Sequence, residues 1–77
     1  MSYALKTSIG TFVIYNRNED QIPEVEILGD QWTGTGCWHF GWKDGDQFRH
    51  GYESAEAAQD ACDSYVWAIN HDQGWTP

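Results

Sequence analysis

The chain of 77 residues is poor in basic side chains. It contains four Lys and Arg residues against twelve Asp and Glu residues, for a formal net charge of −8. Nucleic acids and anionic membranes are bound mainly through Lys and Arg, so this shortage argues against direct binding to either. A basic protein surface is the partner that such a charge favours.

Cysteine is also scarce, with only Cys37 and Cys62. We expect Cys37 on a strand face turned away from the helix that carries Cys62, so we predict two free thiols, as is usual in a reducing cytosol. No signal peptide, lipidation motif or long apolar run is visible. These absences predict a cytoplasmic protein, in the host cytoplasm if a phage encodes it, without a membrane partner.

The motifs of catalysis and of cofactor binding are missing as well. The glycine-containing segment GTGCWHFG lacks the phosphate-binding pattern and the strand–loop–helix context of nucleotide sites. The Cys and His residues match no common zinc spacing, and Ser, His and Asp occur without a nucleophile motif. The sequence therefore predicts no enzyme activity, no cofactor and no metal.

Aromatic residues, in contrast, are abundant, with five Trp, four Tyr and three Phe. A core of this chain length is marginal on its own, and large aromatic side chains compensate because each buries a large area. The length fits a single domain that spans residues 1–77.

The segment Cys37–Tyr52 is typical of a β-hairpin, with strands Cys37–Trp42 and Gln47–Tyr52 around the turn residues 43–46. A two-residue loop would divide the aromatic side chains between both faces. A three-residue loop, with Gly45 in the left-handed conformation, gathers them on one face, and we favour it because burial selects the register. That face carries Trp38, Phe40, Trp42, Phe48, His50 and Tyr52.

A helix is predicted over Ser54–Asn70, with Ser54 as the N-cap. Gly74 is a plausible stop signal, and residues 75–77 are expected to form a short tail. The helical spacing of small and apolar residues predicts a buried stripe. Its members are Ala58, Ala61, Cys62, Tyr65, Val66 and Ile69.

The first half of the chain contains candidate strands at Tyr3–Thr7, Thr11–Tyr15 and Glu24–Leu28. The strand Thr11–Tyr15 is apolar on both faces, which indicates a central position. Residues 29–36 are expected to form a flexible connection. The predicted fold is α+β: an antiparallel sheet of three to four strands packed by one C-terminal helix, in a two-layer sandwich.

An acidic line follows the outer face of the predicted helix, because its members are three or four residues apart. Trp67 continues this line by one turn. The line is either an ordinary solvated face or a binding stripe with an aromatic anchor, since exposed Trp is enriched at binding hot spots. Its acidic members are Glu53, Glu56, Asp60 and Asp63. A secondary acidic surface of Glu24, Glu26, Asp44 and Asp46 could extend it.

The run GWKDGDQFRHGYESAEAAQDA combines an aromatic strand, an Asp-Gly turn, a second strand and an Ala-rich helix. It resembles the three-strand-plus-helix arm-binding domains of phage integrases, which read DNA through a basic sheet. In size, charge and compactness the chain resembles small acidic inhibitor proteins of phages and mobile elements. Those include anti-CRISPR and anti-restriction proteins, some of which mimic DNA.

These observations favour a non-catalytic binding protein, an inhibitor that docks its acidic helix face onto a basic site of a nucleic-acid-handling complex. The alternative is a small self-associating module, monomeric or dimeric, that uses a sheet edge such as Glu24–Leu28 or its aromatic face. A third hypothesis, a small ligand-binding or enzymatic domain, requires a deep pocket lined by residues such as Trp38, His39, His50 or Cys37.

Overall fold

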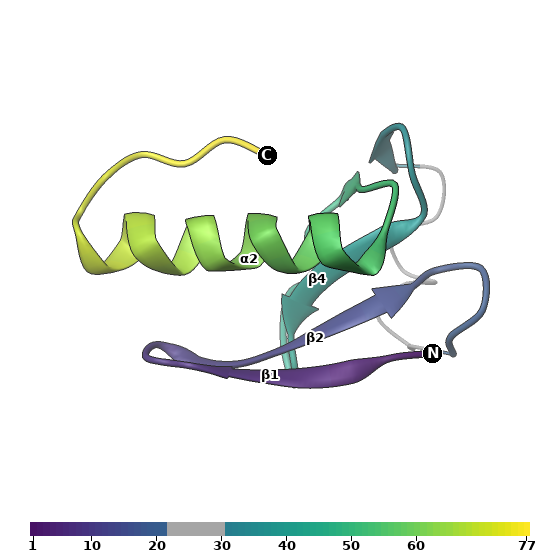
Figure 1. The fold of residues 1–77 in the computed structure, drawn as a ribbon, viewed down its shortest axis with the longest axis horizontal. Helices are drawn as coiled ribbons and strands as arrows, with labels where there is room; N and C mark the ends of the chain where they lie inside the picture. Colours follow the sequence, from purple (N-terminus) through teal and green to yellow (C-terminus); the bar gives the residue numbers. More distant parts are fainter. Residues whose placement is uncertain (22–30) are drawn as a thin grey trace.

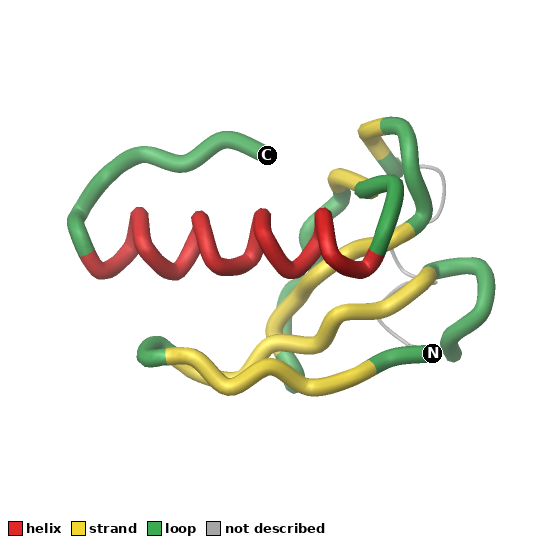
Figure 2. The backbone as a smooth tube through the Cα atoms, viewed as in Figure 1, coloured by secondary structure: helices red, strands yellow, loops and turns green. Residues whose placement is uncertain are grey.

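The computed structural model describes residues 1–21 and 31–77 of the chain. A three-stranded antiparallel sheet, in the order β1-β2-β4, packs against one C-terminal helix (Figure 1, Figure 2). The strands are β1 (Tyr3–Thr7), β2 (Gly10–Asn16) and β4 (Trp38–Trp42), and the helix is α2 (Ala55–Asn70). The predicted α+β architecture is confirmed. The predicted strand Glu24–Leu28 lies outside the described residues.

The strands β1 and β2 form a hairpin around the turn residues Ser8 and Ile9, with Thr7 paired to Gly10. Gly10 has a φ of +144°, a conformation that favours glycine, and an added Cβ would lie 2.7 Å from the Trp42 ring. The strand β2 is apolar on both faces, and this pattern predicted a central position. The prediction is confirmed, because β2 lies between β1 and β4.

The second hairpin keeps the favoured register beside its turn. Gly41 is bridged to Gln47, and the Trp42 amide donates to the carbonyl of Asp46 at 3.0 Å. These pairs leave a three-residue loop, residues 43–45, as predicted. Gly45 does not have the expected positive φ, because the positive-φ glycines of the described residues are at other positions.

Further from the turn, the predicted continuous return strand Gln47–Tyr52 is wrong. Trp38 is bridged to Tyr52 and not to His50, so four residues of the return segment face two of β4. Within the extra length, β5 (His50–Gly51) pairs in parallel with β3 (Thr33–Gly34). Residues 29–36, predicted as a plain connection, therefore contribute a short strand in their described part.

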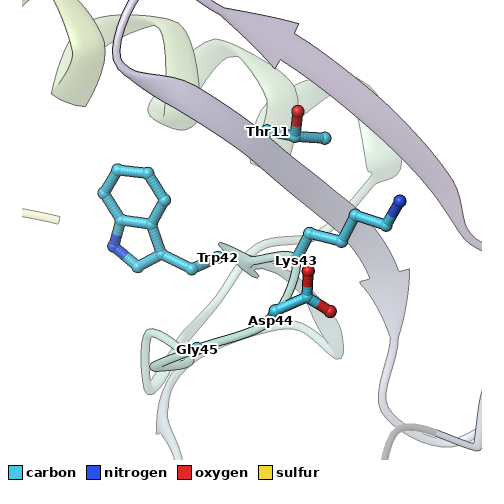
Figure 3. A pocket seen from close by; sticks show the side chains of 5 residues that line it. All are labelled: Thr11, Trp42, Lys43, Asp44 and Gly45. Atoms are coloured by element: carbon cyan, nitrogen blue, oxygen red, sulfur yellow. The ribbon is translucent and has the colours of Figure 1, made fainter.

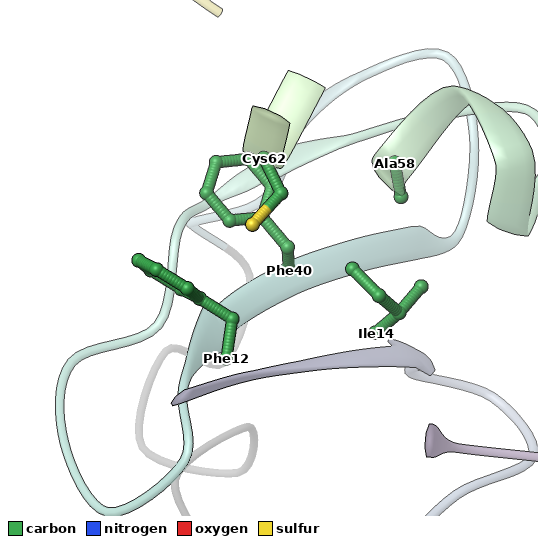
Figure 4. Close-up of a cluster of buried hydrophobic side chains, with 5 residues drawn as sticks. All are labelled: Phe12, Ile14, Phe40, Ala58 and Cys62. Carbon is green, nitrogen blue, oxygen red and sulfur yellow. The ribbon is translucent and has the colours of Figure 1, made fainter. Parts of the chain in front are cut away.

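The hydrophobic core lies between the sheet and α2 (Figure 4). Phe40 is completely buried, and its ring stacks on Phe48 with the centroids 4.5 Å apart. The predicted aromatic face is confirmed as the core face, although His50 is not part of the cluster. Because α2 covers this face, it is not a free interaction surface. The fully buried members of the core are Phe12, Ile14, Phe40, Ala58 and Cys62.

The helix begins as predicted, because the Ser54 hydroxyl accepts a hydrogen bond of 3.0 Å from the amide of Ala57. It also ends at Asn70, as predicted. The left-handed residue after the helix is Asp72, with a φ of 52°, and not the predicted stop residue Gly74. The Gln73 amide then donates to the carbonyl of Ala68 at 2.8 Å, which satisfies one of the last helical carbonyls.

The buried stripe of α2 is shifted at its last turn. Ile69 was predicted to be buried but is 49 % exposed, whereas Ala68 is buried. The residues after the helix also differ from a plain tail. Trp75 packs back onto Phe40, Phe48 and Tyr65, with ring centroids 5.2 to 5.9 Å apart. This tryptophan closes the far side of the aromatic cluster.

Candidate functional site: the acidic face of α2

The four carboxylates of the acidic line, Glu53, Glu56, Asp60 and Asp63, are all exposed. None of them forms an ion pair within residues 1–21 and 31–77, a part of the chain that contains all four Lys and Arg residues. The ion pairs found there join the N-terminal amine to Glu19 and Asp20. The negative charge of the acidic line is therefore presented to solvent without a neutralising partner from the described chain.

The helix arranges this line from its first turn onward. Glu53 precedes the N-cap and accepts a long hydrogen bond of 3.5 Å from the hydroxyl of Thr35. Glu56 lies in the first turn, where the positive end of the helix dipole stabilises a carboxylate. Asp60 and Asp63 follow at the spacing that places side chains on one face.

Trp67 ends the acidic line and is 57 % exposed. Its ring is stacked on that of His71, with the centroids 4.2 Å apart and the planes 18° apart. The His71 Nδ1 atom lies 2.7 Å from the carbonyl oxygen of Trp67, so Nδ1 donates a hydrogen bond to that carbonyl. The predicted anchor residue is thus exposed and held in place by its neighbour one turn along.

Contacts at two points tie α2 to the first hairpin. The Tyr3 hydroxyl donates to Gln59 Oε1 at 2.7 Å. The side-chain amide of Asn70 donates to the hydroxyl of Ser8, also at 2.7 Å. Burial raises the pKa of Tyr3, and the negative charge of Asp63 raises it further. The acidic line therefore borders β1.

Two residues of the predicted secondary acidic surface, Asp44 and Asp46, lie in the described part of the chain. Asp44 and Asp46 are exposed in the turn after β4, and neither forms a hydrogen bond or ion pair with α2. Glu24 and Glu26 lie outside the described residues. That the secondary surface extends the acidic line stays a prediction.

An open pocket of about 560 Å³ lies beside the turn of the second hairpin (Figure 3). Trp42 and Thr11 line one part of it and the turn residues Lys43, Asp44 and Gly45 line the other. None of the residues expected to line a ligand pocket (Trp38, His39, His50 or Cys37) takes part. The pocket lacks a cluster of acids, bases or nucleophiles that would indicate chemistry.

A second polar cluster, missed from the sequence, lies on the sheet face opposite α2. Arg17 Nη1 is 2.9 Å from His39 Nε2 and donates to the carbonyl of Gly36 at 2.7 Å. The Trp32 ring lies 5.3 Å from the Arg17 guanidinium carbon, and its centroid is 4.4 Å from that of His39. The only signal of this cluster in the sequence is the alternation of side chains along the strand, which turns His39 away from the aromatic face.

The hydrogen bonds determine the protonation state of His39. A guanidinium group only donates, so Nε2 accepts and Nδ1 carries the proton, 3.3 Å from the carbonyl of Phe48. Burial lowers the pKa of His39 to about 4, and the charge of Arg17 lowers it further in the same direction. The cluster therefore holds a buried, neutral histidine beneath the half-buried Arg17 and Trp32.

The two cysteines are free, as predicted. Burial raises the pKa of the Cys62 thiol to about 12, with a further contribution from Asp63. Cys37 is partly exposed, and its sulfur accepts a hydrogen bond of 3.2 Å from the side-chain amide of Asn16. Among the described residues, no group of three or more His, Cys, Asp or Glu side chains could hold a metal ion.

The described residues also contain no helix with the length and apolar character needed to cross a membrane. Comparisons with known protein families, with curated proteins and with solved structures find no match to this chain.

Proposed function

We propose that this protein is a non-catalytic inhibitor that docks the acidic face of α2 onto a basic site of a nucleic-acid-handling protein complex. In this role it acts in the manner of an anti-CRISPR or other DNA-mimic protein. The observation that carries the proposal is the acidic line of exposed carboxylates, unpaired within the described residues, that ends in an exposed tryptophan.

The physical basis is the match between a row of carboxylates and a row of phosphates. Carboxylates one helical turn apart accept charge-assisted hydrogen bonds from Arg and Lys side chains that otherwise hold nucleic-acid phosphates. A net charge of −8 steers the protein towards such a basic site and makes association fast at low ionic strength. Trp67 supplies a large apolar contact at the end of the row. Tryptophan is enriched among the residues that contribute most of the binding energy of an interface.

The test is affinity capture from a bacterial lysate at low and at high salt, with the bound proteins identified by mass spectrometry. We expect one basic nucleic-acid-handling complex that is recovered at low salt and lost at high salt. Its affinity is then measured for variants of the acidic line. Asp60→Asn together with Asp63→Asn should weaken binding by about tenfold, because two charge-assisted contacts are lost.

The matched control combines Asp44→Asn with Asp46→Asn, which changes the net charge by the same amount at a turn that, within the described residues, has no hydrogen bond or ion pair to α2. The affinity of this control should be within about twofold of that of the native protein, because only the general effect of net charge is lost. Equal losses in the two double variants would show that only net charge matters. An unchanged affinity when Glu56, Asp60 and Asp63 are neutralised together would remove the site assignment.

A further inference from the structure

Among residues 1–21 and 31–77, the edge of the sheet at β1 is open. Within the described residues β1 pairs only with β2, so its other side carries backbone groups without a strand partner. Such an edge is a template for an additional strand. Its position matters here because Tyr3 bonds to Gln59 of α2, and Asp63 of the acidic line acts on the same tyrosine.

The pairing pattern identifies which backbone groups face outward. The Lys43 amide donates to the carbonyl of Thr11 at 3.0 Å, so the backbone of Thr11 is directed towards β4. Lys6, its partner in β1, is therefore in a non-hydrogen-bonded pair, and its N–H and C=O point away from β2. Alternation along the strand gives Ala4 the same orientation. The open edge thus offers the backbone donors and acceptors of Ala4 and Lys6.

The helix packs mainly on β2 and β4 and meets the first hairpin through two side-chain hydrogen bonds. The hydrogen bonds from Tyr3 to Gln59 and from Asn70 to Ser8 join the two elements at separated points. Eleven helical residues rise about 16.5 Å, and five strand residues advance about the same distance, so the helix and β1 run in a similar direction. Figure 1 shows the helix above the sheet along this direction.

The two faces of the edge differ in charge. Tyr3 and Leu5 face α2, because Tyr3 bonds to Gln59 and Leu5 packs on the core. Ala4 and Lys6 therefore face the opposite side. An added strand would meet the negative charge of Asp63 on the helix side and the positive charge of Lys6 on the other.

We propose that the open edge of β1 and the acidic line of α2 together bind an extended basic segment of the partner protein as an additional antiparallel strand. Every second side chain of this segment is Lys or Arg and lies on the helix side. This inference rests on the proposed function and specifies how the partner is recognised. A second copy of the chain is a poor occupant, because pairing would bring two molecules of charge −8 together.

The probe is a peptide of alternating Lys and Thr, about nine residues long, which exceeds the five residues of β1. Its binding is followed by amide chemical shifts of the labelled protein at low salt. We expect the largest shifts at Ala4 and Lys6, with smaller ones along the acidic line. Asp63→Asn should weaken binding by about threefold, whereas Asp46→Asn in the turn after β4 should not.

Backbone methylation gives the sharpest test. Residues directly opposite Ala4 and Lys6 share their face, so an antiparallel peptide bonds to β1 through the amides of its Thr residues. Methyl groups on the backbone amides of the Thr residues should abolish binding. The same number of methyl groups on the backbone amides of the Lys residues should leave the affinity within about threefold. Equal weakening by both peptides, or the opposite order, overturns the proposal.

Ala4→Pro removes one outward donor without removing a β1–β2 hydrogen bond, and proline is tolerated at sheet edges. It should weaken the peptide by about tenfold. If the variant fails to fold, the methylated peptides still decide. Concentration-dependent sedimentation of the native protein, abolished by Ala4→Pro, would show that a second copy occupies the edge and would overturn the proposal.

Failure here is distinguishable from failure of the proposed function. Suppose that the peptide changes amide chemical shifts only in α2 and that backbone methylation of the peptide leaves its affinity unchanged. Strand addition is then wrong, and docking through the acidic line stands. If neutralising Glu56, Asp60 and Asp63 leaves partner capture unchanged, the proposed function is wrong whatever the peptide does.

Discussion

Protonation of His39 should destabilise the fold as the pH falls. His39 is completely buried, and its Nε2 atom accepts a hydrogen bond from Arg17 at 2.9 Å. A proton on Nε2 would replace this hydrogen bond by two cations in contact, in a part-buried site where solvent screens them poorly. The unfolded chain has no such restriction, so its histidine takes up a proton at the ordinary pKa of about 6.5.

The sign and size of the effect follow from these two pKa values. The pKa of the folded state, about 4, is below that of the unfolded state. The unfolded state therefore binds the proton first as the pH falls, and stability is lost between about pH 6.5 and 4. The difference corresponds to about 3 kcal/mol in all, of which about 2 kcal/mol is lost between pH 7.5 and 5.

The assay is urea unfolding at about pH 7.5 and at about pH 5, with the free energy of unfolding compared at the two values. His39→Gln should reduce the pH dependence by about 2 kcal/mol, even if it lowers the stability at both values. His71→Gln is the control, because His71 is exposed. If His39→Gln and the native protein show the same difference between the two pH values, His39 is not the group that senses acid.

Three further expectations concern the helix cap, the thiols and a close backbone approach. Ser54→Ala should cost about 1 kcal/mol in thermal or urea unfolding, because the Ala57 amide loses its acceptor, and an unchanged stability would contradict the capping role. In the folded protein a thiol reagent should modify Cys37 well before Cys62, as peptide mapping would show, since burial keeps the Cys62 thiol protonated; equal rates would contradict its burial. Gly36→Ala should destabilise by about 2 kcal/mol or more, because the new Cβ would overlap the backbone carbonyl of Tyr52, whereas Gly74→Ala, in open space, should change stability by less than about 0.5 kcal/mol in the same unfolding assay.

Local patterns were sufficient for most of the architecture. The two-residue alternation of the aromatic side chains predicted both the core face of the second hairpin and its register beside the turn. The helix start followed from Ser54, and the central position of β2 followed from its apolar character on both faces. These features depend on residues close together in the chain, where spacing alone decides which side chains share a face.

The acidic line was also readable from the sequence, because helical spacing places its members on one side of α2 whatever the rest of the fold does. Spacing could not decide whether Trp67 would be buried. That depended on where α2 meets the sheet, and the structure leaves Trp67 exposed while Ala68 is buried and Ile69 is not. A rotation of the helix by a fraction of a turn exchanges such neighbours, and the packing of the whole core determines it.

Contacts between distant segments were decided by the tertiary structure alone. Trp75 returns to the aromatic cluster of the second hairpin, and Arg17 meets His39 across the face opposite the helix. No periodicity connects these residues, because the chain between them is free to take many paths until the core forms. The open edge of β1 beside the acidic line is of the same kind. The sequence by itself determined which side chains share a face, and the tertiary structure decided which faces meet.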